Sequence, residues 1–228
     1  MNKLSGTIPP EISNLANLIY LDLRINQISG TIPSQIGSLV KLQILFIFDN
    51  HLNGPIPGEI GQLWSLTKLS LGGNFLSSIP ASLGNLNNLS LLYLYGKLSG
   101  PIPSIDLWRN ILKEKSPQCL GNISSLQYVM MSHNNLSGEL PPSNCNLTSL
   151  KVLHLGRNNL KGAIPQCFGN MSGNLEVLDM EHNNLFGTLP TAFSIGSALR
   201  SFNLNGNRLE GKIPRSLEIC QRLEVLLI

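Results

Sequence analysis

The sequence predicts a solenoid, a stack of short repeated units that share one hydrophobic core. Three features recur together about every 24 residues along the 228-residue chain. Apolar residues are spaced as LxxLxL, an asparagine follows most of these groups, and an Ile-Pro or Leu-Pro pair follows most of the asparagines. One unit leaves its apolar edge exposed, whereas stacked copies bury it. We therefore interpret residues 1–228 as a single solenoid of about nine to ten repeats, cut through a repeat at both ends.

The stretch LIYLDLRINQISGTIPSQIGSLVK, residues 18–41, shows one unit in full. Leu21 and Leu23 alternate with outward-facing residues, and this period of two predicts a short half-buried strand. Beyond the strand, Gly30 and Pro33 supply turn chemistry and interrupt any helical pattern. We therefore expect a continuous parallel sheet along one side, the concave side, and sparse helix, mostly short 3-10 turns and loops, on the other.

The same pattern places each element in order along the chain. The LxxLxL groups, which we expect to form the strands, lie at residues 18–23, 42–47, 66–71, 89–94, 126–131, 150–155, 175–180, 199–204 and 223–228. The asparagine after each strand has a short amide that can satisfy backbone groups of its own and neighbouring turns. We expect these amides to form a ladder at Asn26, Asn50, Asn74, Asn110, Asn134, Asn158, Asn183 and Asn207.

The spacing fails once, at an irregular junction over residues 96–115. Successive Ile-Pro prolines lie 23 to 25 residues apart elsewhere, but Pro103 and Pro117 lie only 14 apart. We interpret this as the loss of half a unit, with a crippled strand over 102–107 that contains Pro103. Such a defect removes partners for core leucines and ladder bonds, so we expect the junction to be the weakest part of the rod.

The four cysteines allow more than one arrangement. Cys119 and Cys167 occupy the same slot two units apart, near 10 Å at the spacing of parallel strands, which is beyond the reach of a disulfide. Cys145 lies in the unit between them, and one bridge to either neighbour is geometrically conceivable. The interpretation that we prefer from the sequence is small buried thiols. Cys220 completes the set.

Composition and motifs argue against several classes of protein. The net charge of +3 is spread without a basic run, which argues against nucleic acid as a partner. No run of about 18 apolar residues predicts membrane insertion, and the N-terminus has no apolar signal core. Phosphate-binding loops, kinase signatures and the GxSxG motif are missing, and the histidines and acidic residues are scattered. We therefore predict neither an enzyme nor a metal or cofactor site.

The outward strand positions form the concave surface and carry the predicted contacts. Aromatic side chains gather in the first half and polar ones in the second, so we expect an apolar patch followed by a hydrogen-bonding patch. The alternative is that the aromatic rings stack on one another across strands. The candidate contact residues are Tyr20, Arg24, Phe46, Phe48, Tyr93, Tyr95, Tyr128, His154, Asp179, Glu181 and Asn203. Sequons for N-glycosylation in a secreted chain occur at Asn88, Asn122, Asn135, Asn146 and Asn170.

The repeat resembles a known type. The segments SGTIP at 29–33 and LSGELP at 136–141 recur in phase with the strand leucines, as in the plant-specific extracellular leucine-rich repeat. Essentially the whole chain resembles ectodomains of plant receptor-like proteins and receptor kinases, and its PQCxGN units resemble the disease-resistance type. The resemblance implies a curved right-handed superhelix on the extracellular side of the plasma membrane. It also implies peptide, protein or glycan ligands and a partner receptor kinase.

Three functions follow from this resemblance. The leading hypothesis is a ligand-recognition module of a plant cell-surface receptor in defence or development signalling, which binds through its concave and lateral faces. The second is a secreted inhibitor of pathogen cell-wall-degrading enzymes, similar to polygalacturonase inhibitors, which use the same repeat. The third is a truncated receptor fragment without a function.

Overall fold

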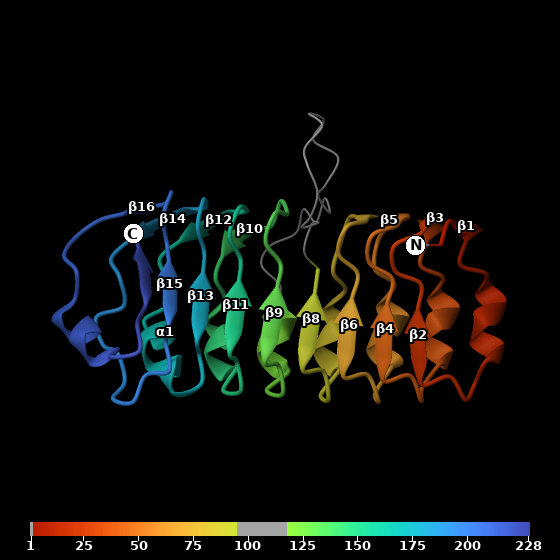
Figure 1. Cartoon of the computed structure of the whole chain (residues 1–228), viewed down its shortest axis with the longest axis horizontal. Coiled ribbons are helices and arrows are strands. Elements are labelled where there is room, and N and C mark those ends of the chain that lie inside the picture. The colour runs from red at the N-terminus through yellow and green to blue at the C-terminus, as the bar shows by residue number, and fades with distance from the viewer. Residues whose placement is uncertain (1, 95–117) are drawn as a thin grey trace.

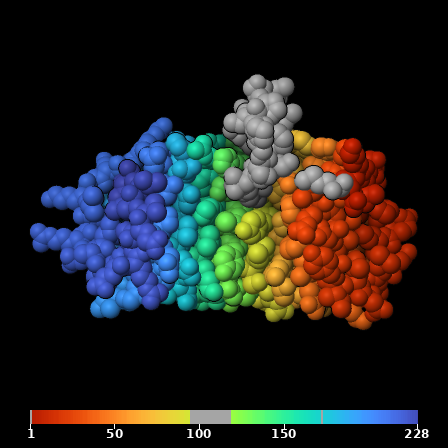
Figure 2. Space-filling view, in the orientation of Figure 1, coloured from red at the N-terminus to blue at the C-terminus, as the bar shows by residue number. Residues whose placement is uncertain are grey.

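The structure is a computed structural model that describes residues 2–94 and 118–228. Its repeats follow one another along the long axis, so the colour in Figure 2 changes steadily from one end to the other. One strand from each repeat joins a parallel sheet in the order β17-β15-β13-β11-β9-β8-β6-β4-β2 (Figure 1). The predicted solenoid with its parallel sheet is therefore confirmed. The outward side of this sheet is called the concave face below.

The strands of the large sheet coincide with the LxxLxL groups. Their bounds are Tyr20–Asp22 for β2, Ile44–Phe46 for β4, Lys68–Ser70 for β6, Leu91–Tyr93 for β8, Tyr128–Met130 for β9, Val152–His154 for β11, Val177–Asp179 for β13, Ser201–Asn203 for β15 and Val225–Leu227 for β17. The central residue of each strand from β2 to β15 of this sheet is buried, and Leu45, Leu69 and Leu92 are each 0% exposed. Burying one such side chain contributes about 2 kcal/mol.

A second set of parallel strands, which the sequence interpretation missed, follows the ladder asparagines. These strands form two further sheets, with the orders β1-β3-β5-β7 and β10-β12-β14-β16. Their bounds are Ser5–Thr7 for β1, Gln27–Thr31 for β3, His51–Gly54 for β5, Phe75–Leu76 for β7, Ser137–Glu139 for β10, Asn159–Gly162 for β12, Asn184–Gly187 for β14 and Arg208–Leu209 for β16. Gly30, which the sequence predicts to be a turn residue, has a positive φ of 77°. It nevertheless belongs to a strand, in which it lies opposite Leu52 of β5 in the next repeat.

The side opposite the large sheet consists of short 3-10 turns, as predicted. They are η1 (Pro10–Asn14), η2 (Ser34–Ser38), η3 (Gly58–Gln62), η4 (Ala81–Asn85), η5 (Gln118–Asn122), η6 (Pro142–Asn146), η7 (Met171–Gly173) and η8 (Arg215–Ile219), and one α-helical turn, α1, spans Cys167–Asn170. The proline of the Ile-Pro pair precedes the turn in extended conformation, as at Pro57 with φ −65° and ψ 143°. Glycine then allows close stacking, because a Cβ at Gly61 would lie 2.7 Å from the Cβ of Ser82 in the next turn.

The ladder asparagines link the two sides of the rod. Asn74 is 2% exposed. Its Oδ1 accepts a hydrogen bond from the Leu52 N–H at 3.1 Å, and its Nδ2 donates to the carbonyls of Ile47 at 3.0 Å and Leu71 at 2.9 Å. One amide thus satisfies buried backbone groups of two repeats. Equivalent bonds to backbone carbonyls are made by Asn26, Asn50, Asn134, Asn158, Asn183 and Asn207. Asn110 lies outside the described residues.

The large sheet is continuous across the irregular junction. Strand β8 pairs directly with β9, so that Leu92 lies opposite Val129. The Leu94 N–H donates to the Met130 carbonyl at 2.8 Å, as its counterparts do in regular repeats. A Cβ at Gly84 in η4 would lie 3.0 Å from the Cβ of Cys119 in η5, so the 3-10 turns also remain stacked.

The lost half unit itself stays a prediction, because the residues concerned lie outside the described part of the chain. The paired strands β8 and β9 leave no place in the sheet for a further strand between them. The repeat that begins at β8 is longer than its neighbours, because the paired residues 92 and 129 are separated by 37 positions. The proposed strand at 102–107, and the junction over 96–115 as a whole, lie outside the described residues.

A disulfide joins Cys145 in η6 to Cys167 at the start of α1, with the two Cα atoms 5.8 Å apart. The preferred interpretation of buried thiols is wrong for this pair, and the alternative of one bridge from Cys145 to a neighbouring unit is correct. The bridge forms because the two cysteines fall in equivalent parts of adjacent stacked turns. Cys220 is buried, and the Sγ of Cys119 lies 4.0 Å from the Pro80 carbonyl oxygen.

Replacing Asn74 with alanine tests the ladder. The change leaves the buried Leu52 N–H and the carbonyls of Ile47 and Leu71 without this partner, so we expect the free energy of unfolding to fall by about 3 kcal/mol. Urea denaturation followed by circular dichroism measures the loss. Asn53→Ala, which changes an exposed asparagine in β5 of the preceding repeat, serves as the control. Equal stability of the two variants would show that the ladder contributes little.

Candidate ligand-binding site on the concave face

In-register pairing aligns the outward side chains into rows that cross the strands. One row consists of the last residues of the eight strands from β2 to β15 and runs through Asp22, Phe46, Ser70, Tyr93, Met130, His154, Asp179 and Asn203. The row beside it holds half-buried apolar side chains over four neighbouring strands, at Leu91, Tyr128, Val152 and Val177. The face thus presents an apolar row next to a row of mixed polarity.

The first part of the face carries a compact aromatic cluster. The ring centroids of Tyr20 and Phe46 are 6.0 Å apart, and those of Phe46 and Phe48 are 6.2 Å apart, both edge to face. The Arg24 guanidinium lies 5.8 Å from the Phe46 centroid and 5.7 Å from that of Phe48. Its Nε is 3.0 Å from an Asp22 carboxylate oxygen, so the cation is paired. The rings do stack across strands, and their role in binding stays a prediction.

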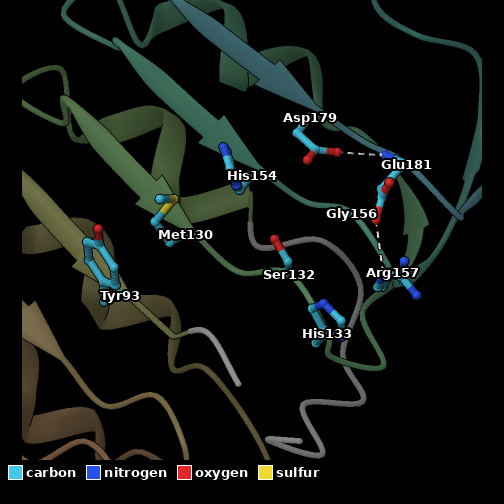
Figure 3. Close-up of a pocket in the computed structure, with 9 residues that line it drawn as sticks. All are labelled: Tyr93, Met130, Ser132, His133, His154, Gly156, Arg157, Asp179 and Glu181. Carbon is cyan, nitrogen blue, oxygen red and sulfur yellow. Dashed lines mark hydrogen bonds and ion pairs between the residues drawn. The ribbon is translucent and has the colours of Figure 1, made fainter. Parts of the chain in front are cut away.

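A pocket of about 330 Å³ occupies the middle of the face (Figure 3). Its lining comes from four consecutive strands of the large sheet and the turns that follow them, at Tyr93, Met130, Ser132, His133, His154, Gly156, Arg157, Asp179 and Glu181. The hollow forms where small residues, Ser132 and Gly156, lie between larger ones, and both are buried. A Cβ at Gly156 would lie 2.9 Å from Cγ of Glu181, so glycine gives that side chain its space.

The turn after each strand brings further side chains to the pocket. The residue before a ladder asparagine has left-handed backbone, with φ near 55° at both His133 and Arg157. This conformation is uncommon for residues other than glycine. Here it turns the chain from one sheet toward the next, and both side chains line the pocket. Neither residue is among the predicted contacts. The sequence does contain a signal for both, because each lies directly before a ladder asparagine.

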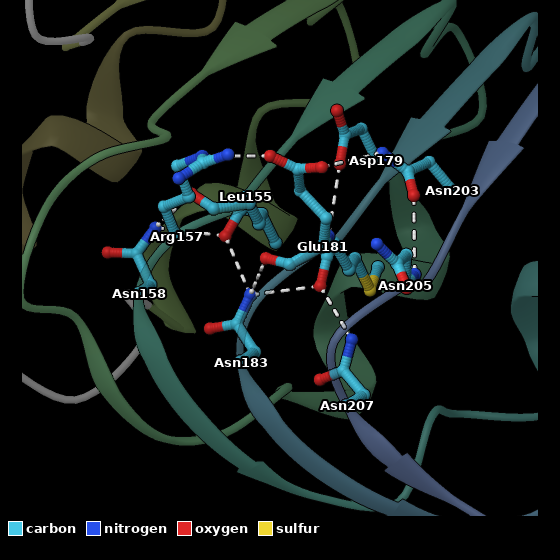
Figure 4. A network of polar contacts seen from close by, with 11 residues as sticks. Leu155, Arg157, Asn158, Asp179, Glu181, Asn183, Asn203, Asn205 and Asn207 are labelled. Atoms are coloured by element: carbon cyan, nitrogen blue, oxygen red, sulfur yellow. Dashed lines mark hydrogen bonds and ion pairs between the residues drawn. The ribbon is translucent and has the colours of Figure 1, made fainter. Parts of the chain in front are cut away.

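Glu181 is the centre of a polar network at one end of the pocket (Figure 4). Its Oε1 lies 2.9 Å from Nε of Arg157, and its Oε2 accepts a hydrogen bond from Asn203 at 3.1 Å. Burial acts to raise the pKa of the Glu181 carboxyl. The hydrogen bonds from Asn203 and Arg157, with the charges of Arg157 and His182, outweigh burial and leave this pKa below its ordinary value. Glu181 is therefore ionised near neutral pH and both of its oxygens are occupied.

A family model described as a leucine-rich repeat region matches residues 2–137, more than half of the chain. The chain belongs to the leucine-rich-repeat family. A second model, described as Leucine Rich Repeat, matches residues 149–171, 174–194 and 198–220. The comparison with curated protein sequences gives no match, so the likeness rests on these models and on solved structures.

Solved structures extend the likeness of this leucine-rich-repeat protein to plant receptor ectodomains. The ectodomain of the receptor kinase GASSHO1/SCHENGEN3 from Arabidopsis thaliana, in complex with CASPARIAN STRIP INTEGRITY FACTOR 2, is 32% identical with a TM-score of 0.82, over 100% of this chain and 28% of that one. The Arabidopsis HAESA ectodomain with an N-terminally extended IDA peptide hormone is 33% identical with a TM-score of 0.82, over 98% of this chain and 36% of that one.

HAESA has also been solved with the peptide hormone IDA and the co-receptor SERK1, at 31% identity and a TM-score of 0.76, over 100% of this chain and 40% of that one. The chain thus spans 28% to 40% of these receptor chains. A plant ice-binding protein is similar as well, at 28% identity and a TM-score of 0.70, over 97% of this chain and 76% of that one. The fold alone therefore does not decide the function.

The predicted contact residues fall into separate groups. Tyr93, His154, Asp179 and Glu181 come together in the pocket. Tyr20, Arg24, Phe46 and Phe48 form the aromatic cluster, and Tyr128 belongs to the apolar row. Asn203 is 8% exposed and supports Glu181 instead of presenting a free surface, and Tyr95 lies outside the described residues.

The sequon asparagines are all exposed, at Asn88, Asn122, Asn135, Asn146 and Asn170. Within the described ranges, every helix is too short or too polar to cross a membrane.

The lowered pKa of Glu181 predicts a dependence of stability on pH. The charged carboxylate stabilises the fold above its unfolded pKa of about 4.5, and this contribution disappears as the pH falls through the lower folded value. The parent should therefore be more stable than Glu181→Gln at pH 7, and the difference should vanish at pH values below the folded pKa. Urea unfolding at pH 7 and at a pH below the folded pKa measures this difference in the free energy of unfolding, with Glu59→Gln on η3 as the control. A pH-independent difference would show that charge is not its source.

Proposed function

We propose that this chain is the ligand-recognition segment of an extracellular plant receptor, and that it binds a peptide along the concave face. The observation that supports it most directly is the pocket between Tyr93 and Glu181, which several repeats build together on that face. Receptor ectodomains of similar structure are solved in complex with CASPARIAN STRIP INTEGRITY FACTOR 2 and with a peptide hormone. A peptide that crosses the strands meets the apolar row and the pocket side by side.

Rigidity of the site supports binding of a flexible ligand. The pocket walls belong to strands of one sheet, and the Asn158 and Asn183 ladder bonds fix the turns that carry Arg157 and the segment after Glu181. A preordered surface loses little conformational entropy on binding, so more of the contact energy appears as affinity. A flexible peptide bears most of the ordering cost in such a complex.

We place this segment on the extracellular side of the plasma membrane, with N-glycans on its exposed sequons. The Cys145–Cys167 disulfide supports an oxidising compartment, because disulfides are rare in the cytosol. A partner receptor kinase is part of the proposal, supported by the structure of HAESA with a co-receptor. The identity of the ligand decides whether the whole receptor acts in defence or in development signalling.

Selection from a displayed library of linear 12-residue peptides tests the proposal. We expect the immobilised, disulfide-bonded chain to select a convergent peptide family. The double variant Tyr93→Ala/His154→Ala should bind it about tenfold more weakly or worse, because truncating central contacts costs at least about 1.4 kcal/mol. Trp64→Ala, which truncates a side chain that is 66% exposed after η3, should have no effect. Failure to select convergent peptides, or equal binding by the double variant, would refute the proposal.

A further inference from the structure

We propose that the pocket takes the cationic side chain of a lysine or arginine in the peptide, with the Asp179 carboxylate as its counter-charge. This inference rests on the proposed function and names the chemistry that the site selects. It follows from the charges of the lining, from a comparison of equivalent positions in three repeats, and from the order of side chains along one row.

The lining has an excess negative charge at one end. Apart from its histidines, the charged groups of the lining are Asp179, Glu181 and Arg157, whose formal charges sum to −1. Arg157 is already paired with Glu181 at 2.9 Å, and the second oxygen of Glu181 is held by Asn203. The charge that remains is that of Asp179. Among the described residues, no basic side chain forms an ion pair with it.

Equivalent positions in other repeats show what sets Asp179 apart. Asp22, Asp179 and Asn203 occupy the same row, and in each the Oδ1 accepts a hydrogen bond from the N–H two residues later, at 3.1, 3.0 and 3.2 Å. That later residue is Arg24 in the first case, and its guanidinium neutralises Asp22 at 3.0 Å. The residue two positions after Asp179 is Glu181, whose carboxylate adds negative charge. Within residues 2–94 and 118–228, the pocket therefore keeps one carboxylate that is not paired with a basic side chain.

The order of side chains along the row matches a basic residue. Tyr93, Met130, His154 and Asp179 lie on four consecutive strands, so about 14 Å separates the first from the last at about 4.8 Å per strand. A lysine or arginine lying along this row has its aliphatic stem against Met130 and its charged end beside Asp179. Such side chains pack their stems on apolar surface and keep their charge on a polar partner. Neutral or acidic side chains leave the Asp179 carboxylate unpaired or repelled.

Peptides chosen in the library selection provide the test. Each arginine in them is replaced by citrulline, which is its uncharged analogue, and each lysine by acetyl-lysine. The affinities of both forms are then measured for the parent, for Asp179→Asn and for Asp22→Asn. Asp179→Asn should fold normally, because Asn203 accepts the same backbone hydrogen bond in the next repeat. Thermal unfolding verifies this. Asp22→Asn is the control, because it removes a carboxylate that lies in the same row but is already paired with Arg24.

We expect one position at which the neutral analogue binds the parent about tenfold more weakly or worse, the size of a lost charge-assisted hydrogen bond. That ratio should fall to near one for Asp179→Asn and remain unchanged for Asp22→Asn. Selected peptides without a basic residue, or the same ratio for the parent and Asp179→Asn, would overturn the inference while leaving peptide binding intact. If no peptide family is selected, the proposed function fails, and this inference fails with it.

Discussion

The buried amide of the ladder asparagine is the interaction on which this structure depends. Each repeat must leave one sheet, turn and enter the next, and the turn carries backbone groups that burial would otherwise leave unpaired. Asn74 satisfies such groups in its own repeat and in the preceding one, and it is nearly inaccessible to solvent. Because the bonds run between repeats, they fix the register as well as the turn. The strands of the concave face consequently align into rows.

The candidate site is a product of this alignment. No single repeat contains the pocket, which takes Tyr93 from one repeat and Asp179 from the third one after it. The left-handed turn before each asparagine adds Arg157 to the lining, and Arg157 in turn holds Glu181. The site therefore depends on direct pairing of β8 with β9. Had a partial strand stood between them, Tyr93 and Met130 would not be neighbours.

The sequence predicts those parts of the structure that each repeat carries within itself. Leucines at LxxLxL spacing show the strands, and the buried Asn74 could be assigned its role from its place after a strand. Features that arise only between repeats were predicted poorly. The second sheets need a neighbour for pairing, as Gly30 has in Leu52, and the Cys145–Cys167 bridge depends on the stacking of two turns. The pocket combines outward strand residues, some of which were predicted, with Arg157, whose side chain reaches the pocket because its backbone has a positive φ.

Amide hydrogen exchange across the junction tests the central claim most directly, which is that one continuous sheet carries the site. The Leu94 and Gln127 amides donate across the β8–β9 pair, to Met130 at 2.8 Å and to Ser90 at 2.9 Å. The Leu71 amide donates to Tyr93 at 2.8 Å in the regular part of the sheet. The account predicts that Leu94 and Gln127 are protected to a degree similar to Leu71, because all three bonds belong to one cooperative array. Rapid exchange at Leu94 and Gln127, with Leu71 protected, would show two separate sheets and contradict it.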